Sequence, residues 1–130
     1  MQSERGRMAL TERIYGWELI LDLKDCNENI SNRYRLVKWV KDLCKVLKMR
    51  PYGSCKVPYF GLKSDRTKGY SLLQFIEESA ITAHFSDVYR TAHVNIFSCR
   101  KFDMDKALKF TVGYFGGKVI RVWKLKRRLR

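Results

Sequence analysis

Three side chains that can do nucleophilic or acid–base chemistry lie in the second half of the chain. Ser79 offers a hydroxyl, His84 an imidazole five residues later, and Cys99 a thiol twenty residues after the serine. A serine hydroxyl can attack a carbonyl, and an imidazole titrates near neutrality and suits a catalytic base. Singly, each residue is common in strands and cores, so a catalytic interpretation depends on how the fold brings them together.

The same residue types can bind metal ions, but their spacing argues against a metal site. The chain has two histidines and four cysteines, which are Cys26, Cys44, Cys55 and Cys99. No two cysteines form a C-x-x-C pair, and the histidines are not paired at ligand spacing. We expect no metal, and we interpret Cys26, Cys44, Cys55 and His93 as structural.

The composition predicts a single basic globular domain. The chain has 130 residues, 45% of them hydrophobic, and a formal net charge of +14. The charged N-terminus lacks a signal core and no apolar run is long enough to span a membrane, so we expect a cytoplasmic protein. The excess charge permits binding to a polyanion, and Lys124–Arg130 holds five of the positive charges.

The chain reads as strands interrupted by two helices. Strands are predicted at Tyr15–Asp25, Tyr70–Ile76, Ala80–Phe85, Ala92–Ser98 and Lys118–Leu125, with Cys55–Leu62 an edge strand at best because of Pro58. One amphipathic helix is predicted from a Ser31 or Asn32 cap to about Met49, and another over Met104–Phe115 after an Asp103 cap.

This order, β-α-β-β-β-α-β, predicts an α+β fold. We expect a two-layer α/β sandwich with a mainly antiparallel sheet and both helices on one face. The domain is predicted over residues 14–126, between a flexible lead-in at 1–13 and a basic tail at 127–130. The middle strands carry apolar residues on both sides, which favours a dimer partner over the second sheet face.

A group of residues resembles a known family in order and spacing. These residues are Gly69, Ser71, Glu78, Ser79, His84 and Cys99. The pattern is similar to that of the prokaryotic S-adenosylmethionine decarboxylase family, and it extends over roughly residues 15–125.

The resemblance implies a proenzyme that cleaves its own Glu78–Ser79 bond and becomes a pyruvoyl-dependent carboxy-lyase. The Ser79 hydroxyl would attack the Glu78 carbonyl, and elimination and hydrolysis would turn Ser79 into the pyruvoyl cofactor. The resemblance assigns His84 as the base, Ser71 as a hydroxyl that assists at the reacting carbonyl, and Cys99 as the proton donor in turnover.

The implied reaction is decarboxylation of S-adenosylmethionine for spermidine biosynthesis. Asp22, Asp87 and Phe60 are the expected substrate-binding residues. The chain departs from the family pattern at Ala80, where a histidine is usual, and at Phe85-Ser86-Asp87, where the family has Thr-Trp-Pro-Glu. Arginine or ornithine as substrate therefore stays open, as does an unprocessed regulatory homologue.

Strand geometry adds one constraint to the implied site. On one straight strand the Cα atoms of Ser79 and His84 would lie roughly 16 Å apart, and the two side chains would point to opposite faces. We therefore predict a homodimer with shared active sites, in which His84 and Ser71 come from the partner. A basic nucleic-acid-binding module is the remaining alternative, and the basic tail permits non-specific polyanion binding.

Overall fold

The computed structural model describes residues 13–130, so nearly all of the predicted lead-in at 1–13 lies outside the described residues. The strands are β1 (Ile14–Lys24), β2 (Pro51–Lys56), β3 (Tyr59–Phe60), β4 (Gly69–Ile76), β5 (Ser79–Ser86), β6 (Thr91–Ser98) and β7 (Lys118–Arg128). The helices are α1 (Arg33–Leu47), α2 (Met104–Phe115) and the short 3-10 helix η3 (Glu28–Ser31).

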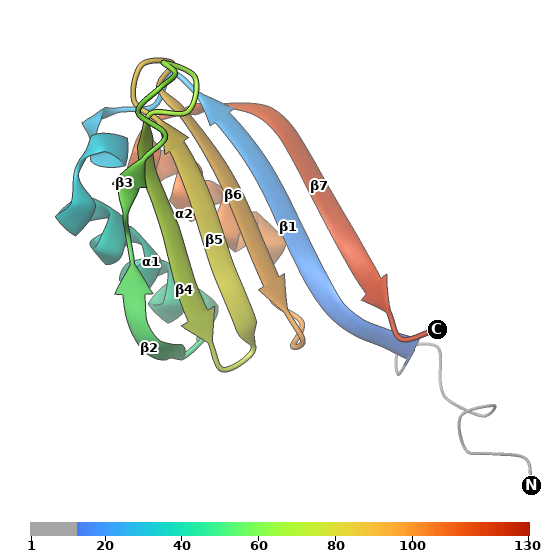
Figure 1. Ribbon diagram of the computed structural model, residues 1–130. Coiled ribbons are helices and arrows are strands. Elements are labelled where there is room, and N and C mark those ends of the chain that lie inside the picture. Colours follow the sequence, from blue (N-terminus) through green and yellow to red (C-terminus); the bar gives the residue numbers. More distant parts are fainter. Residues whose placement is uncertain (1–12) are drawn as a thin grey trace, which may run out of the picture.

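The strands form one antiparallel sheet in the order β2-β4-β5-β6-β1-β7, with β3 paired to β4. Both long helices lie against the same face (Figure 1). The predicted two-layer α+β fold is therefore confirmed. The strand order places the first strand of the chain between the two that come late in it, β6 and β7.

The core lies between the sheet and the helices. Alternate leucines of β1 point into it, and they are Leu19, Leu21 and Leu23. Trp39 of α1 is fully buried at the centre, where its ring packs against Phe85 and Phe115. Its indole N–H donates to the Thr111 hydroxyl over 3.3 Å, so this polar group is satisfied although buried.

Two predicted strands differ from the observed ones by more than one residue at an end. The predicted segment Cys55–Leu62 was wrong as a single strand, because β2 ends at Lys56 and β3 is only Tyr59–Phe60. Pro58 separates them, since proline lacks the N–H that a sheet ladder needs. The last strand runs past Leu125 to Arg128, so two residues of the predicted tail at 127–130 pair with β1.

The second face of the sheet, which we call the open face, is covered by neither helix (Figure 1). The register of the strands places apolar side chains on it, and Tyr52, Phe75, Trp123 and Leu125 are all exposed there. Phe75 keeps 53% of its surface accessible. These exposed side chains lie toward the two edges of the sheet, Tyr52 and Phe75 on β2 and β4 and Trp123 and Leu125 on β7.

Candidate active site

Ser71 and His84 form a hydrogen-bonded pair on the open face. The register of β4 and β5 sets these two residues directly opposite each other. The Ser71 hydroxyl lies 2.8 Å from Nδ1 of the imidazole. Whichever of the two groups donates, the bond occupies Nδ1, so Nε2 is the ring nitrogen left for another reactant.

A second polar pair continues this row across the sheet. His93 of β6 is opposite His84 of β5, and Asp22 of β1 is opposite His93. The Asp22 carboxylate lies 2.9 Å from His93 Nδ1, and the Thr91 hydroxyl lies 3.1 Å from Nε2. Sequence reasoning placed Asp22 among the substrate-binding residues and His93 among the structural ones, and it missed that they meet.

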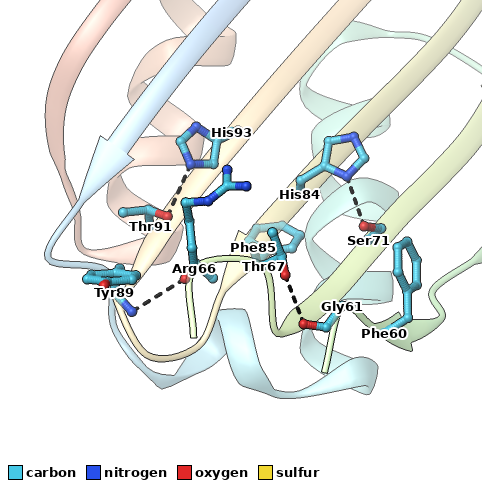
Figure 2. Close-up of a pocket in the computed structure, with 11 residues that line it drawn as sticks. Phe60, Gly61, Arg66, Thr67, Ser71, His84, Phe85, Tyr89, Thr91 and His93 are labelled. Carbon is cyan, nitrogen blue, oxygen red and sulfur yellow. Dashed lines mark hydrogen bonds between the residues drawn. The ribbon is translucent and has the colours of Figure 1, made fainter. Parts of the chain in front are cut away.

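The row borders a pocket of about 530 Å³ (Figure 2). Ser71, His84 and His93 line one side of it. The other side comes from β3, from the segment between β3 and β4, and from the β5–β6 turn, which contribute Phe60, Arg66, Thr67 and Tyr89 among others. Phe60, predicted to contact substrate, is thus a lining residue with an exposed ring.

Glu78 and Ser79 lie at the far end of β5 from this pocket, where the tight turn from β4 ends. Cys99 follows the last residue of β6 and lies beside this turn. Its backbone N–H donates to the Glu78 carbonyl oxygen over 2.8 Å. The Glu78 side chain is held by Arg100 at 3.7 Å and by the Arg50 backbone N–H at 3.4 Å.

Within one protomer the two ends of the candidate site stay apart. Ser79 is opposite Ile76 and Ser98, which are buried on the helix side, whereas His84 projects from the open face. They are five positions apart on the strand, so their Cα atoms are separated by roughly 16 Å. The structure therefore places Cys99 beside the Glu78–Ser79 bond and places His84 in contact with Ser71. Within one protomer these two groups of residues do not meet.

Asp87 does not line the pocket, although it was predicted to bind substrate. Both of its carboxylate oxygens accept hydrogen bonds, from the Tyr59 hydroxyl at 2.6 Å and the Ser31 hydroxyl at 2.8 Å. The bond to Asp87 raises the pKa of the Tyr59 phenol to about 12. Asp87 thus links β3 to η3 and is not among the residues that line the pocket.

Two negative findings apply to residues 13–130. No group of three or more histidine, cysteine or acidic side chains there is arranged to hold a metal ion. No helix in that range has the length and apolar character needed to cross a membrane.

Comparison with family models identifies one family, and comparison with solved structures finds a similar fold. A family model described as S-adenosylmethionine decarboxylase matches residues 17–128. Among solved structures, the adenosylmethionine decarboxylase from Aquifex aeolicus is similar, with a TM-score of 0.71 and 16% sequence identity over 91% of this chain and 94% of that chain. No curated protein matches the sequence.

Proposed function

The chain belongs to the S-adenosylmethionine decarboxylase family, and we propose that it is a self-cleaving proenzyme of that reaction. In this proposal the Glu78–Ser79 bond is cut, Ser79 becomes a pyruvoyl group, and the product decarboxylates S-adenosylmethionine for spermidine biosynthesis. The observation that carries the proposal is the hydrogen bond from the Cys99 N–H to the Glu78 carbonyl oxygen.

That hydrogen bond suits the first step of self-cleavage. When the Ser79 hydroxyl attacks the Glu78 carbonyl carbon, negative charge develops on the oxygen that the Cys99 N–H already contacts. The Ser79 hydroxyl has no hydrogen-bond partner among residues 13–130, so it is free to attack. The residues around this bond therefore fit the formation of a pyruvoyl group.

The later steps need a base and a leaving group. Collapse of the adduct breaks the Glu78–Ser79 amide bond, which leaves the Glu78 acyl group as an ester on the Ser79 oxygen and frees the Ser79 amine. Removal of the Ser79 α-proton then expels Glu78 as a carboxylate and leaves a dehydroalanine, and hydrolysis of that residue gives the pyruvoyl group and ammonia. His84 is the base that the resemblance names, but its distance from Ser79 in one protomer excludes direct contact. We infer a homodimer in which the open faces meet and each Ser79 receives His84 and Ser71 from the partner.

In turnover the pyruvoyl group would supply the carbonyl that takes up the electron pair left behind by carbon dioxide. Cys99 lies next to Ser79's end of the sheet, where its thiol could return a proton to the substrate carbon. The Ser71–His84 pair would meet the substrate from the pocket side, and its bond holds the imidazole in one orientation.

The pocket favours S-adenosylmethionine over arginine or ornithine. Among the described residues that line it, Arg66 is a fixed cation, two are histidines and none is a carboxylate. What distinguishes the candidates is therefore the purine, which S-adenosylmethionine carries and which arginine and ornithine lack. Phe60 and Tyr89 offer aromatic faces, which can stack on a purine and attract a sulfonium.

Intact-mass spectrometry of the purified protein tests the processing step. We expect the 15.4 kDa chain to appear as two fragments divided before residue 79, and Ser79→Ala to remain a single species. Ser54→Ala, at an exposed serine of β2, is the control and should be cleaved normally. Carbon dioxide release from S-adenosylmethionine, arginine and ornithine then identifies the substrate.

A single intact species from the wild-type protein would contradict the proposal. It would favour the unprocessed regulatory homologue, for which Ala80 after the serine is the motivating feature.

A further inference from the structure

We propose that Asp87 is a positioning residue that fastens the loop of residues 61–68, which we call the pocket loop, in place beside the pocket. The pocket loop connects β3 to β4 and supplies Gly61, Arg66 and Thr67 to the pocket lining. The effect on substrate binding rests on the proposed function, because it assumes that the substrate occupies this pocket. The proposal that Asp87 holds the pocket loop in place does not depend on that assumption.

Asp87 holds the chain at both ends of the pocket loop. Tyr59, two residues before the loop begins, donates its hydroxyl to Asp87 Oδ2 over 2.6 Å. Lys68, the last residue of the loop, accepts the Asp87 backbone N–H at its carbonyl oxygen over 3.0 Å. The other carboxylate oxygen accepts the Ser31 hydroxyl over 2.8 Å, which ties the assembly to η3.

The pocket loop is internally bonded, so it can shift as a unit. The Thr67 hydroxyl donates to the Gly61 carbonyl oxygen over 2.8 Å, and the Lys68 N–H donates to the Ser64 carbonyl oxygen over 3.0 Å. Residues 62–68 are all exposed, so little apolar burial holds the loop down. Its attachment to the rest of the molecule therefore depends on a small number of hydrogen bonds.

Other anchors of this segment are weaker or lie at its ends. The Ser86 hydroxyl reaches the Asp65 carbonyl oxygen only at 3.4 Å. Gly69, which follows the loop, passes so close to the Phe85 carbonyl oxygen that a Cβ atom would overlap it. The Tyr59 ring packs edge-on against Tyr70 at 4.8 Å, which aims its hydroxyl at Asp87.

The contacts of Asp87 hold two side chains of the pocket lining in position. Phe60 follows Tyr59 directly, and Arg66 extends from the loop into the pocket on the side of His93 (Figure 2). A loop that has lost the Tyr59–Asp87 bond, and keeps only the backbone bond from Asp87 to Lys68, would present both side chains over a range of positions. Substrate binding would then have to restrict that motion, which weakens binding without altering the reacting groups.

Trypsin provides a test that does not require enzyme activity, because Lys63, Arg66 and Lys68 are cleavage sites within the pocket loop. We expect Asp87→Ala and the milder Tyr59→Phe to raise the rate of cutting at these sites about tenfold. Asp65→Ala is the matched control, because its carboxylate lies in the same loop and has no hydrogen bond among residues 13–130. It should change the rate less than about twofold.

Kinetics of the processed enzyme separates positioning from direct substrate contact. Positioning by Asp87 predicts KM about tenfold higher in Asp87→Ala and Tyr59→Phe, with kcat within about twofold and self-cleavage unchanged. The double variant should be no worse than Asp87→Ala alone, since the bond that Tyr59→Phe removes is already lost in Asp87→Ala. If Asp87 bound the substrate directly, Tyr59→Phe would release its carboxylate and leave KM unchanged or lower.

The outcomes distinguish this proposal from the proposed function. Trypsin rates in Asp87→Ala and Tyr59→Phe equal to the wild-type rate would overturn the fastening, whatever the activity. Faster cutting in a chain that never cleaves itself or releases carbon dioxide would support the fastening and refute the decarboxylase. Thermal melting by circular dichroism identifies a variant that fails to fold, in which case Tyr59→Phe decides.

Discussion

The chemistry open to each side chain of the candidate site depends on which of its polar atoms already have a hydrogen-bond partner. Asp22 and Asp87 were both expected to contact substrate, yet each has internal partners, His93 in one case and Tyr59 with Ser31 in the other. His84 retains Nε2, and Ser79 retains its hydroxyl. Of the residues that the resemblance assigned to catalysis, His84 and Ser79 therefore keep a polar group available, whereas the Ser71 hydroxyl is engaged with His84.

The buried cysteines give a residue-scale prediction about pH. Burial is the main cause that raises the pKa of the Cys44 thiol from 9.0 to about 11, with the nearby Glu78 charge adding to it. The folded state therefore favours the protonated thiol, and the unfolded chain loses its proton first as the pH rises. Stability from this group is present below pH 9 and is lost between about pH 9 and 11.

Urea denaturation of wild type and Cys44→Ala at pH 7, 9 and 11 measures the effect. The stability difference between them should shrink by roughly 2 kcal/mol over the upper interval, because the variant has no thiol to ionise. A difference that stays constant with pH would contradict the assignment, and the comparison cancels changes common to both proteins.

At the scale of elements, turns and caps set the positions of the reacting groups. The turn between β4 and β5 carries the Glu78–Ser79 bond, and the end of β6 brings Cys99 beside it. The helix α1 supplies the buried Trp39 that supports the sheet from behind. Its start is marked by Asn32, whose side chain accepts the Arg35 N–H over 3.1 Å.

The cap of α1 yields a prediction for this element. Asn32→Ala should lower the free energy of unfolding by about 1 kcal/mol, because the first turn of the helix loses an acceptor for one of its free N–H groups. Asn32→Asp keeps an acceptor and should stay close to the wild type. Chemical denaturation measures both, and equal losses in the two variants would show that the cap bond is not the cause.

For the whole molecule, the decisive feature is the uncovered open face with Ser79 and His84 at separate ends of the sheet. Apolar side chains such as Phe75 and Trp123 are exposed there and would be buried by a second sheet packed face to face. A two-fold axis makes each contact occur twice, so one dimer would hold two complete sites.

Co-expression of Ser79→Ala with His84→Ala tests the shared site. Each variant alone should be inactive, but a mixed dimer would contain one site with both native residues. Random pairing should restore about a quarter of the wild-type activity, since about half the dimers are mixed and one of their two sites is complete. Ser79→Ala co-expressed with itself is the control, and no recovery in the mixture would mean that the sites are not shared.

Much of the architecture could be predicted from local sequence patterns. The same patterns predicted that the side chains of Ser79 and His84 point to opposite faces of the sheet. Alternation along β1 and β5 and the 3.6-residue periodicity of α1 and α2 depend on neighbouring residues, so the sequence alone predicted these elements and the faces of their side chains. The break at Pro58 was harder to place, because a proline is compatible with an edge strand or with a gap between two short ones.

The contacts between distant segments were decided only by the tertiary structure. Asp22 and His93 are 71 positions apart and meet because β1 inserts between β6 and β7, an order that no local pattern encodes. The same holds for Tyr59 with Asp87 and for the Cys99 N–H with the Glu78 carbonyl. The sequence determined which groups exist and which way they face, whereas strand order and register determined which of them touch.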